Sequence, residues 1–318
     1  MISNYWPRLA WLALASFFLL HALFASTVAF AAPMAIRFAA RLQPRTGACL
    51  LLSLRLLPFT FSAAIVAAIC VPSYVSFEPE AAGEQIGLVC IAAACLALAL
   101  LLSSAVRALS AAFQSFRHMR RCRNQARPEL LAGSPALVID SNVPFLALAG
   151  ILRPTLIASR GLLNTLSPAA LDAAIRHEQA HRDSRDNLKR LLMLCAPGLF
   201  PLVSGFRSLE QAWTRLAERA ADDRSTSGDR ERAFLLADAL VRVARSGPAP
   251  QPSPLFTPLL PEGTDLRHRV ERLLHPAPVI SPPSARLPIA LATACFAIAV
   301  LQPFTLRAAH ELLEWLVR

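Results

Sequence analysis

Long, mainly apolar runs fill the first third of the chain, and one more lies near its end. They cover about residues 9–32, 50–71, 86–106 and 286–306. A helix needs about 20 predominantly apolar residues to cross a bilayer, and hydrophobic residues make up 55% of the sequence. We therefore predict that each run forms a transmembrane helix and that residues 307–318 form a short tail.

Charged residues between these runs alternate in sign along the chain. The basic ones beside the first and third runs are Arg37, Arg41, Arg45, Arg107, Arg117, Arg120, Arg121, Arg123 and Arg127, and the acidic ones after the second run are Glu78, Glu80 and Glu84. Positively charged loops stay in the bacterial cytoplasm. We therefore predict a multi-pass protein of the bacterial inner membrane, with both termini outside. Membrane orientation therefore accounts for the basic residues behind the net charge of +11. Direct nucleic-acid binding is not expected.

Residues 108–285, predicted to lie in the cytoplasm, have the pattern of a small α+β domain. Short apolar segments between turn residues predict strands, and longer periodic segments predict helices. The strands are expected at 136–140, 144–149 and 154–159, the helices at 168–186, 209–223, 230–245 and 265–274, and a proline-rich loop at 246–263. The fold class is thus a mainly α membrane protein, with three spans in residues 1–107 and a small sheet in the domain that follows.

The predicted helix 168–186 carries the sequence HEQAH, in which His177 and His181 stand four residues apart. Residues at this spacing project from one helix face, and two imidazoles there can share one Zn²⁺. Glu178 lies one position round, where it can act as a general base on water rather than as a ligand. Since arginines surround the motif, a solvated polar helix is the alternative interpretation.

A third zinc ligand is expected at Glu218, in the sequence LAERAADDR, 37 residues after His181. This distance allows a helix, a turn and a returning helix. Asp222 lies one turn further on the same face and could hold a histidine N–H. The apolar segment 191–203 between the two motifs is too short to cross the membrane, so both motifs can lie on one side. Taken alone, Glu218 would be interpreted as an ordinary exposed helical acid.

Two stretches resemble the bacterial β-lactam sensor/antirepressor metallopeptidases of the BlaR/MecR type. One is VPFLALAGILRPTLIASRGLLNTLSPAALDAAIRHEQAHRDSRDNLKRLL, and the other is ERAADD at residues 218–223. The three-plus-one arrangement of spans is similar as well. The resemblance implies a gluzincin-like zinc endopeptidase domain with His177, His181 and Glu218 as ligands, Glu178 as catalytic base and Asp222 behind them. We expect the form without the extracellular penicillin-binding sensor domain.

Further site candidates carry weaker signals. His268 or Arg269 could stabilise an oxyanion, although a basic helix lying on lipid is the simpler interpretation. The segment before the zinc helix could offer an edge strand to an extended substrate, because such peptides add to a free edge by main-chain hydrogen bonds. That edge is predicted at Phe145, Leu146, Ala147, Leu148 and Ala149.

The sequence therefore predicts a membrane-bound endopeptidase with one zinc ion. Its expected substrate is a cytoplasmic protein such as a winged-helix transcriptional repressor, or the chain itself, in signal transduction. One alternative is a quality-control or prenyl-processing type membrane metallopeptidase, which usually places the later glutamate further downstream. The other is a membrane signalling protein without catalytic activity.

Overall fold

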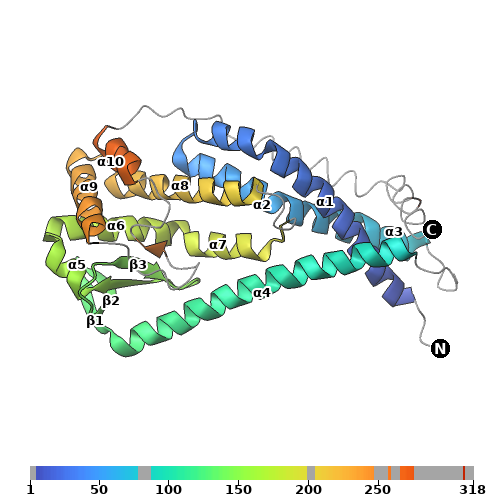
Figure 1. Ribbon diagram of the computed structural model, residues 1–318, viewed down its shortest axis with the longest axis horizontal. Coiled ribbons are helices and arrows are strands. Elements are labelled where there is room, and N and C mark those ends of the chain that lie inside the picture. The colour runs from blue at the N-terminus through green and yellow to red at the C-terminus, as the bar shows by residue number, and fades with distance from the viewer. Residues whose placement is uncertain are drawn as a thin grey trace.

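The computed structural model is mainly α-helical and contains one small mixed sheet (Figure 1). It describes residues 5–77, 87–198, 205–246, 257–258, 266–275 and 311. The predicted fourth span, the acidic second loop and most of the C-terminal tail and of the proline-rich loop lie outside these residues.

Three long apolar segments coincide with three of the predicted spans. They are α1 (Tyr5–Ala39), α2 (Pro44–Ile65) with its continuation to Phe77, and α4 (Leu88–Gln125), and each is long and apolar enough to cross a membrane. The continuation of α2 consists of a π-helix (Val66–Cys70) and α3 (Val71–Phe77). Pro72 explains the π-helix, because a proline has no N–H and its ring displaces the carbonyl four residues earlier.

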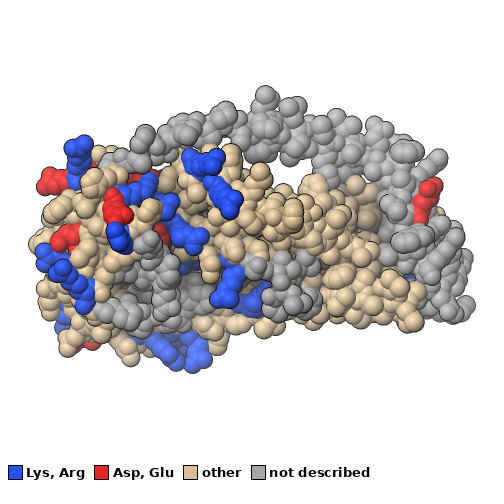
Figure 2. Space-filling view, turned by 45° about the horizontal axis from the view of Figure 1, so that its top comes forward, with Lys and Arg blue, Asp and Glu red and all other residues tan. Residues whose placement is uncertain are grey.

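The helix α4 extends far beyond its apolar part. The predicted span and the basic segment after it form one helix of 38 residues, about 57 Å long at the usual rise. The boundary expected between residues 107 and 108 therefore lies inside a continuous helix. In Figure 2, charged side chains gather at the end of the molecule that holds the sheet, α9 and α10, and the surface towards the other end is largely uncharged. This distribution suits a membrane protein with a polar domain at one end of its spans.

The sheet has the strand order β1-β2-β4-β3-β5. Its strands are β1 (Arg127–Leu131), β2 (Ser134–Ile139), β3 (Leu146–Ala149), β4 (Thr155–Ser159) and β5 (Thr257–Pro258). Three of them match the predicted strands, and only β2 and β4 pair in parallel. The sequence analysis missed β1, which forms a hairpin with β2 through Ala132 and Gly133, both at positive φ. A two-residue turn of this kind matches the twist of a hairpin.

The predicted substrate edge at 145–149 is not a free edge in the structure. The strand β3 pairs with β4 on one side, and β5 pairs with it on the other side at Ala147 and Leu148. Two residues of the proline-rich loop occupy this edge from more than a hundred positions away, so a substrate could add to Phe145–Ala149 only in place of β5, and the substrate-binding role of this strand stays a prediction. The pairing also shows that this side of β3 accepts an antiparallel strand.

Six helices surround the sheet and join it to the spans. They are α5 (Arg160–Thr165), α6 (Pro168–Ser184), α7 (Asp186–Cys195), α8 (Gly205–Thr226), α9 (Arg230–Arg245) and α10 (Leu266–Leu274). As predicted, Ser167 caps α6 by accepting a hydrogen bond from the Ala170 N–H, with Pro168 in the first turn. Apolar residues of the sheet, α6, α9 and α10 share one core, whereas α8 packs its apolar face on α1 and α2. The helix α8 thus lies between the membrane helices and α6.

A buried arginine joins the membrane helix α2 to α7 and α8. The Arg55 guanidinium lies 2.7 Å from Glu210 Oε1 on α8 and donates to the carbonyl oxygens of Met193 and Ala196 at the end of α7. It also lies over the Phe206 ring. The last carbonyl oxygens of a helix have no hydrogen-bond donor within the helix. Arg55 supplies a donor to two of them at the end of α7.

Replacing Arg55 by methionine should destabilise the junction between the spans and the polar domain. Leaving buried acceptors without a donor costs about 1–3 kcal/mol, so R55M should unfold at a lower temperature than the wild type in the same detergent. The matched control is Arg37→Met, because Arg37 is exposed near the end of α1. Equal melting temperatures for R55M and the control would contradict the role given to Arg55.

Candidate metal centre

The helix α6 directs the two histidines of the HExxH motif into the interior. His177 and His181 are 0% and 1% exposed, so they do not lie on a solvated polar face. Alanines at 170, 173, 174 and 180 are buried along the same helix, and their small side chains allow neighbouring elements to approach closely. The helix ends at Arg185, whose φ of 55° reverses the chain and starts α7 at Asp186.

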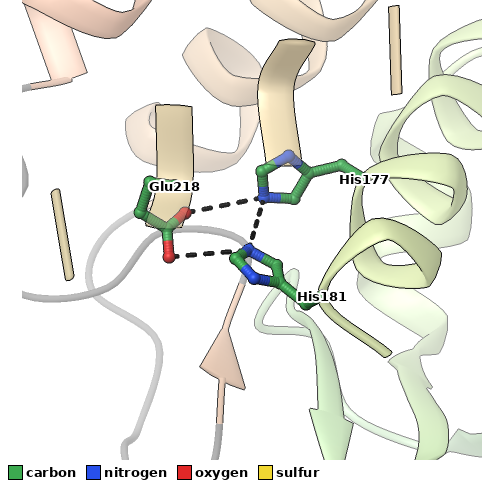
Figure 3. Close-up of side chains that lie close together, drawn as sticks. All are labelled: His177, His181 and Glu218. Carbon is green, nitrogen blue, oxygen red and sulfur yellow. Dashed lines mark hydrogen bonds and ion pairs between the residues drawn. The ribbon is translucent and has the colours of Figure 1, made fainter. Parts of the chain in front are cut away.

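Glu218 on α8 completes a buried group of three metal-binding side chains (Figure 3). The two Nε2 atoms lie 3.2 Å apart, and the Glu218 oxygens lie 3.5 Å from His177 Nε2 and 3.6 Å from His181 Nε2. Ligands bound tetrahedrally at 2.0–2.1 Å stand about 3.3–3.4 Å apart. The spacing therefore fits one small ion at the centre of the three groups, and the group could hold a metal ion.

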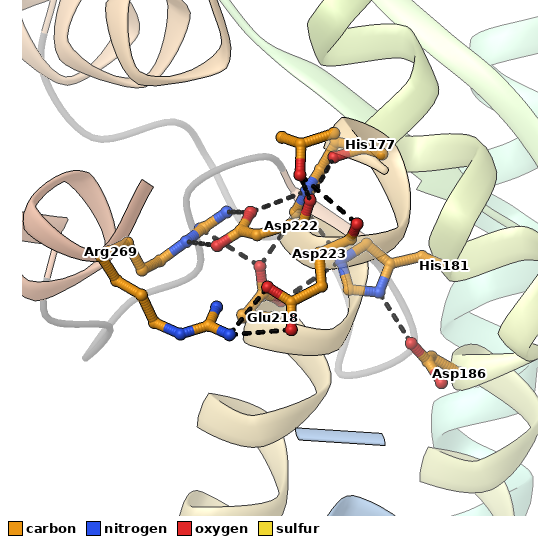
Figure 4. A network of polar contacts seen from close by, with 10 residues as sticks. His177, His181, Asp186, Glu218, Asp222, Asp223 and Arg269 are labelled. Atoms are coloured by element: carbon orange, nitrogen blue, oxygen red, sulfur yellow. Dashed lines mark hydrogen bonds and ion pairs between the residues drawn. The ribbon is translucent and has the colours of Figure 1, made fainter. Parts of the chain in front are cut away.

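A carboxylate lies behind each imidazole (Figure 4). Asp222 Oδ1 is 3.0 Å from His177 Nδ1, and Asp186 Oδ2 is 2.7 Å from His181 Nδ1. An ionised carboxylate only accepts hydrogen bonds, so Asp186 holds the proton of His181 at Nδ1 and leaves the lone pair of its Nε2 to the other ligands. The charge of Asp222 beside His177 Nδ1 favours the same tautomer there. The sequence analysis foresaw this position for Asp222 but gave Asp186 no role. Its only sequence signal is an acid shortly after the second histidine.

Arg269 on α10 lies against the carboxylates of α8. Its guanidinium donates to both oxygens of Asp222, at 2.7 and 3.0 Å, and lies 3.2 Å from Glu218. The structure therefore brings Arg269 to the site, although a lipid-facing helix was the simpler expectation. The neighbouring candidate, His268, is exposed and lines a different pocket between α10, α8 and the turn from α1 to α2.

Glu178 is fully buried beside the histidines but belongs to neither the ligand group nor the carboxylate pairs. Neither of its oxygens has a hydrogen-bond partner among the described residues. Burial raises the pKa of Glu178 to about 7, although the nearby histidines and Arg269 lower it in part. A carboxyl group with such a pKa can accept and return a proton near neutral pH.

The pKa values of the remaining ionisable groups show that the site favours bound positive charge. Burial alone would lower the pKa of His181, but the charge of Glu218 and the bond to Asp186 raise it to about 10. The pKa of His177 is raised too, because the bonds to Asp222 and Glu218 outweigh its burial. Burial opposes ionisation of Asp222, but Arg269 and His177 hold its pKa at about 2. A bound cation would interact with the same negative charges.

Comparison with known proteins adds no relative. No protein-family model, no curated protein and no solved structure matches the chain. The chemical interpretation of the site therefore rests on its geometry and on the residue types that form it.

We predict that His181→Ala abolishes stable metal binding. The wild-type chain should keep about one metal ion through dialysis, since three ligands with an open position form a typical site, and the variant should lose it. Elemental analysis of the purified full chain measures this directly. His275→Ala serves as control, because His275 is exposed and follows directly after α10. Equal metal content in the wild type and H181A would exclude the proposed ligand group.

We also predict that Asp186→Asn weakens metal binding without abolishing it. Removing the carboxylate behind a ligating histidine typically costs about 10–100-fold in metal affinity. Competition with a chelator of known affinity would measure the change. Asp183→Asn is the matched control, because Asp183 is exposed three residues earlier. If both variants bound metal as tightly as the wild type, Asp186 would have no part in holding His181.

Proposed function

We propose that this chain is a membrane-bound zinc endopeptidase. The observation that carries the proposal is the buried His177–His181–Glu218 group together with the buried Glu178. Glu178 lies next to this group but is not one of its three members. Two histidines and one glutamate are a ligand set used by catalytic zinc sites, which keep a position open for water or substrate. A structural zinc site would instead use four protein ligands and would not need a buried carboxyl group with a pKa near 7.

Each side chain of the centre has a separate role in this proposal. Zinc, when bound, supplies a Lewis acid that polarises a peptide carbonyl and activates water. Glu178 accepts the proton of the attacking water and passes it to the leaving amine. Asp222 and Asp186 hold the two imidazoles by their Nδ1 protons, so that each Nε2 remains available to the metal. The protein thereby fixes the reacting groups before substrate arrives.

Arg269 is better suited to holding the ligand helix than to stabilising an oxyanion. Its three guanidinium nitrogens all face carboxylates of α8, two at Asp222 and one at Glu218. A guanidinium bound in this way has little capacity left for a developing negative charge. We therefore propose that Arg269 keeps Glu218 and Asp222 ionised and in place. Its positive charge is one of the causes that lower the pKa of both carboxyl groups.

The substrate would lie along β3 in an extended conformation. Asn187 on α7 ties this strand to the site, because it follows Asp186 and donates to the carbonyl oxygens of Leu148 and Gly150. Because β5 already pairs with β3 over two residues, a substrate strand would take its place there. Because the pairing of β5 with β3 is short, few main-chain hydrogen bonds are lost when a substrate strand displaces β5.

The expected substrate is a protein on the cytoplasmic side of a bacterial inner membrane, such as a winged-helix repressor. Arginines in the loop after α1 and along the second half of α4 support this orientation by the positive-inside rule. The polar domain that holds the metal group follows α4, so it lies on the side of those arginines. Cleavage of a repressor there would couple the membrane spans to transcription.

Glu178→Gln should separate metal binding from catalysis. The variant keeps the shape and loses the proton acceptor, so cleavage should fall by about 10²–10⁴-fold while metal content stays at the wild-type level. The assay incubates the zinc-loaded full chain in detergent with a library of proteome-derived peptides. Mass spectrometry then identifies new peptide termini and their rates of appearance.

The control for this variant is Glu231→Gln, which changes an exposed glutamate at the start of α9. It should cleave as the wild type does, and chelation of zinc should stop both. Cleavage by E178Q at the wild-type rate would rule out Glu178 as the base. A wild-type chain that holds zinc and cleaves nothing in the library would count against an endopeptidase of broad specificity.

A further inference from the structure

A basic pocket lies between the turn from α1 to α2, the helix α8 and the helix α10. Its volume is about 630 Å³. The residues that line it are Ala40, Arg41, Leu42, Pro44, Leu216, Arg219, His268, Glu271, Arg272 and His275. It is separate from the metal group, which lies on the other side of α8 towards α6.

The charge of this pocket is strongly unbalanced. Three arginines and two histidines line it, against the single acid Glu271, which pairs with Arg267. Arg272 is itself paired with Asp223, so Arg41 and Arg219 are the arginines that leave the excess of positive charge. Like charges gathered around a cavity destabilise the protein unless an anion enters. The pocket therefore has the electrostatics of an anion site.

The pocket also lies close to the membrane. The first apolar run ends near residue 32, and the helix continues for about 12 Å before the turn at Ala40. Headgroups fill the layer next to the hydrocarbon, and arginine side chains extend back toward it. Leu42, Pro44 and Leu216 add apolar surface beside the basic groups, which suits a ligand with both a charged and an apolar part.

From this geometry we propose that the pocket binds the phosphate group of an anionic phospholipid. Arg41 and Arg219 face the phosphate from the turn and from α8, and α10 closes the site from the far side. Arginine binds phosphate oxygens through several N–H groups at once. The same chemistry would recognise free phosphate, so the experiment must separate the two sources.

A lipid in this pocket would also bear on the metal group. The helix α10 contributes His268 and Arg272 to the pocket, His275 follows directly after it, and from a neighbouring face of the helix Arg269 reaches Glu218 and Asp222. An anion that draws α10 towards α8 would therefore favour the contacts of Arg269. This consequence rests on the proposed metal function, whereas lipid binding itself does not.

Binding is measured with the full chain in neutral detergent micelles, using fluorescent phosphatidylglycerol and phosphatidylcholine as probes. The wild type should bind phosphatidylglycerol saturably and phosphatidylcholine weakly. The double variant R41Q/R219Q should raise the apparent Kd for phosphatidylglycerol about 30-fold, since each basic residue contributes roughly a fivefold preference for anionic lipid. The control R37Q/R45Q removes the same charge near the same turn from residues that do not line the pocket, and it should change the Kd by less than about threefold.

Melting curves and metal content show whether the variants fold. If R41Q/R219Q does not fold, the single variant R41Q is used in its place. Displacement of the probe by inorganic phosphate at similar concentration would identify free phosphate as the ligand, and displacement only by lipid would identify the headgroup. Both results support the pocket as a phosphate site. Equal weakening by the two double variants, or no preference of the wild type for phosphatidylglycerol, would overturn the proposal. Metal content and peptide cleavage test the proposed function separately, so a wild type that holds zinc and cleaves peptides but shows no preference for phosphatidylglycerol would contradict the lipid site alone.

Discussion

The burial of several ionisable groups around one point is the constraint on which the polar domain depends. Three ionised carboxylates, those of Asp186, Glu218 and Asp222, lie near the two histidines, and among the described residues Arg269 and Lys189 bring permanent positive charge. With neutral imidazoles, one negative charge is uncompensated, and Glu178, whose pKa is raised to about 7, adds part of a second. The raised pKa values of both histidines express this imbalance, and a divalent cation would remove it. Buried charges are costly unless they are paired in this way.

This constraint explains why the elements converge from three parts of the chain. The helix α6 supplies both imidazoles, α8 supplies Glu218 and Asp222, and α10 supplies Arg269. The helix α8 cannot move without disturbing the spans, because it packs on α1 and α2 and is bonded through Glu210 to Arg55. Arg55 also holds the end of α7, whose first residue holds His181. The membrane helices are therefore in physical contact with both sides of the metal group.

Local sequence signals predicted most of the helices and the positions of the metal-binding residues. Ser167 and Pro168 determine where α6 begins, and the spacing of His177 and His181 follows directly from helix geometry. Glu218 could be predicted as the third metal-binding residue because its separation from His181 matches the length of a helix, a turn and a returning helix. The fourth span, the family resemblance, the activity and the orientation remain predictions, because the described residues do not test them.

The features that the sequence did not reveal are all set by contacts between distant segments. Pairing of β5 with β3 joins residues 257–258 to 147–148, and no local pattern in a proline-rich loop indicates a strand partner. Arg269 lies in a helix that also carries Arg267 and Arg272, so only the packing of α10 on α9 shows that this one arginine turns inward. Asp186 reaches His181 only because Arg185 adopts a left-handed conformation, which glycine or asparagine would have signalled and arginine does not. A backbone conformation unfavourable for arginine is retained here, and the bond of Asp186 to a buried imidazole is the interaction that offsets its cost.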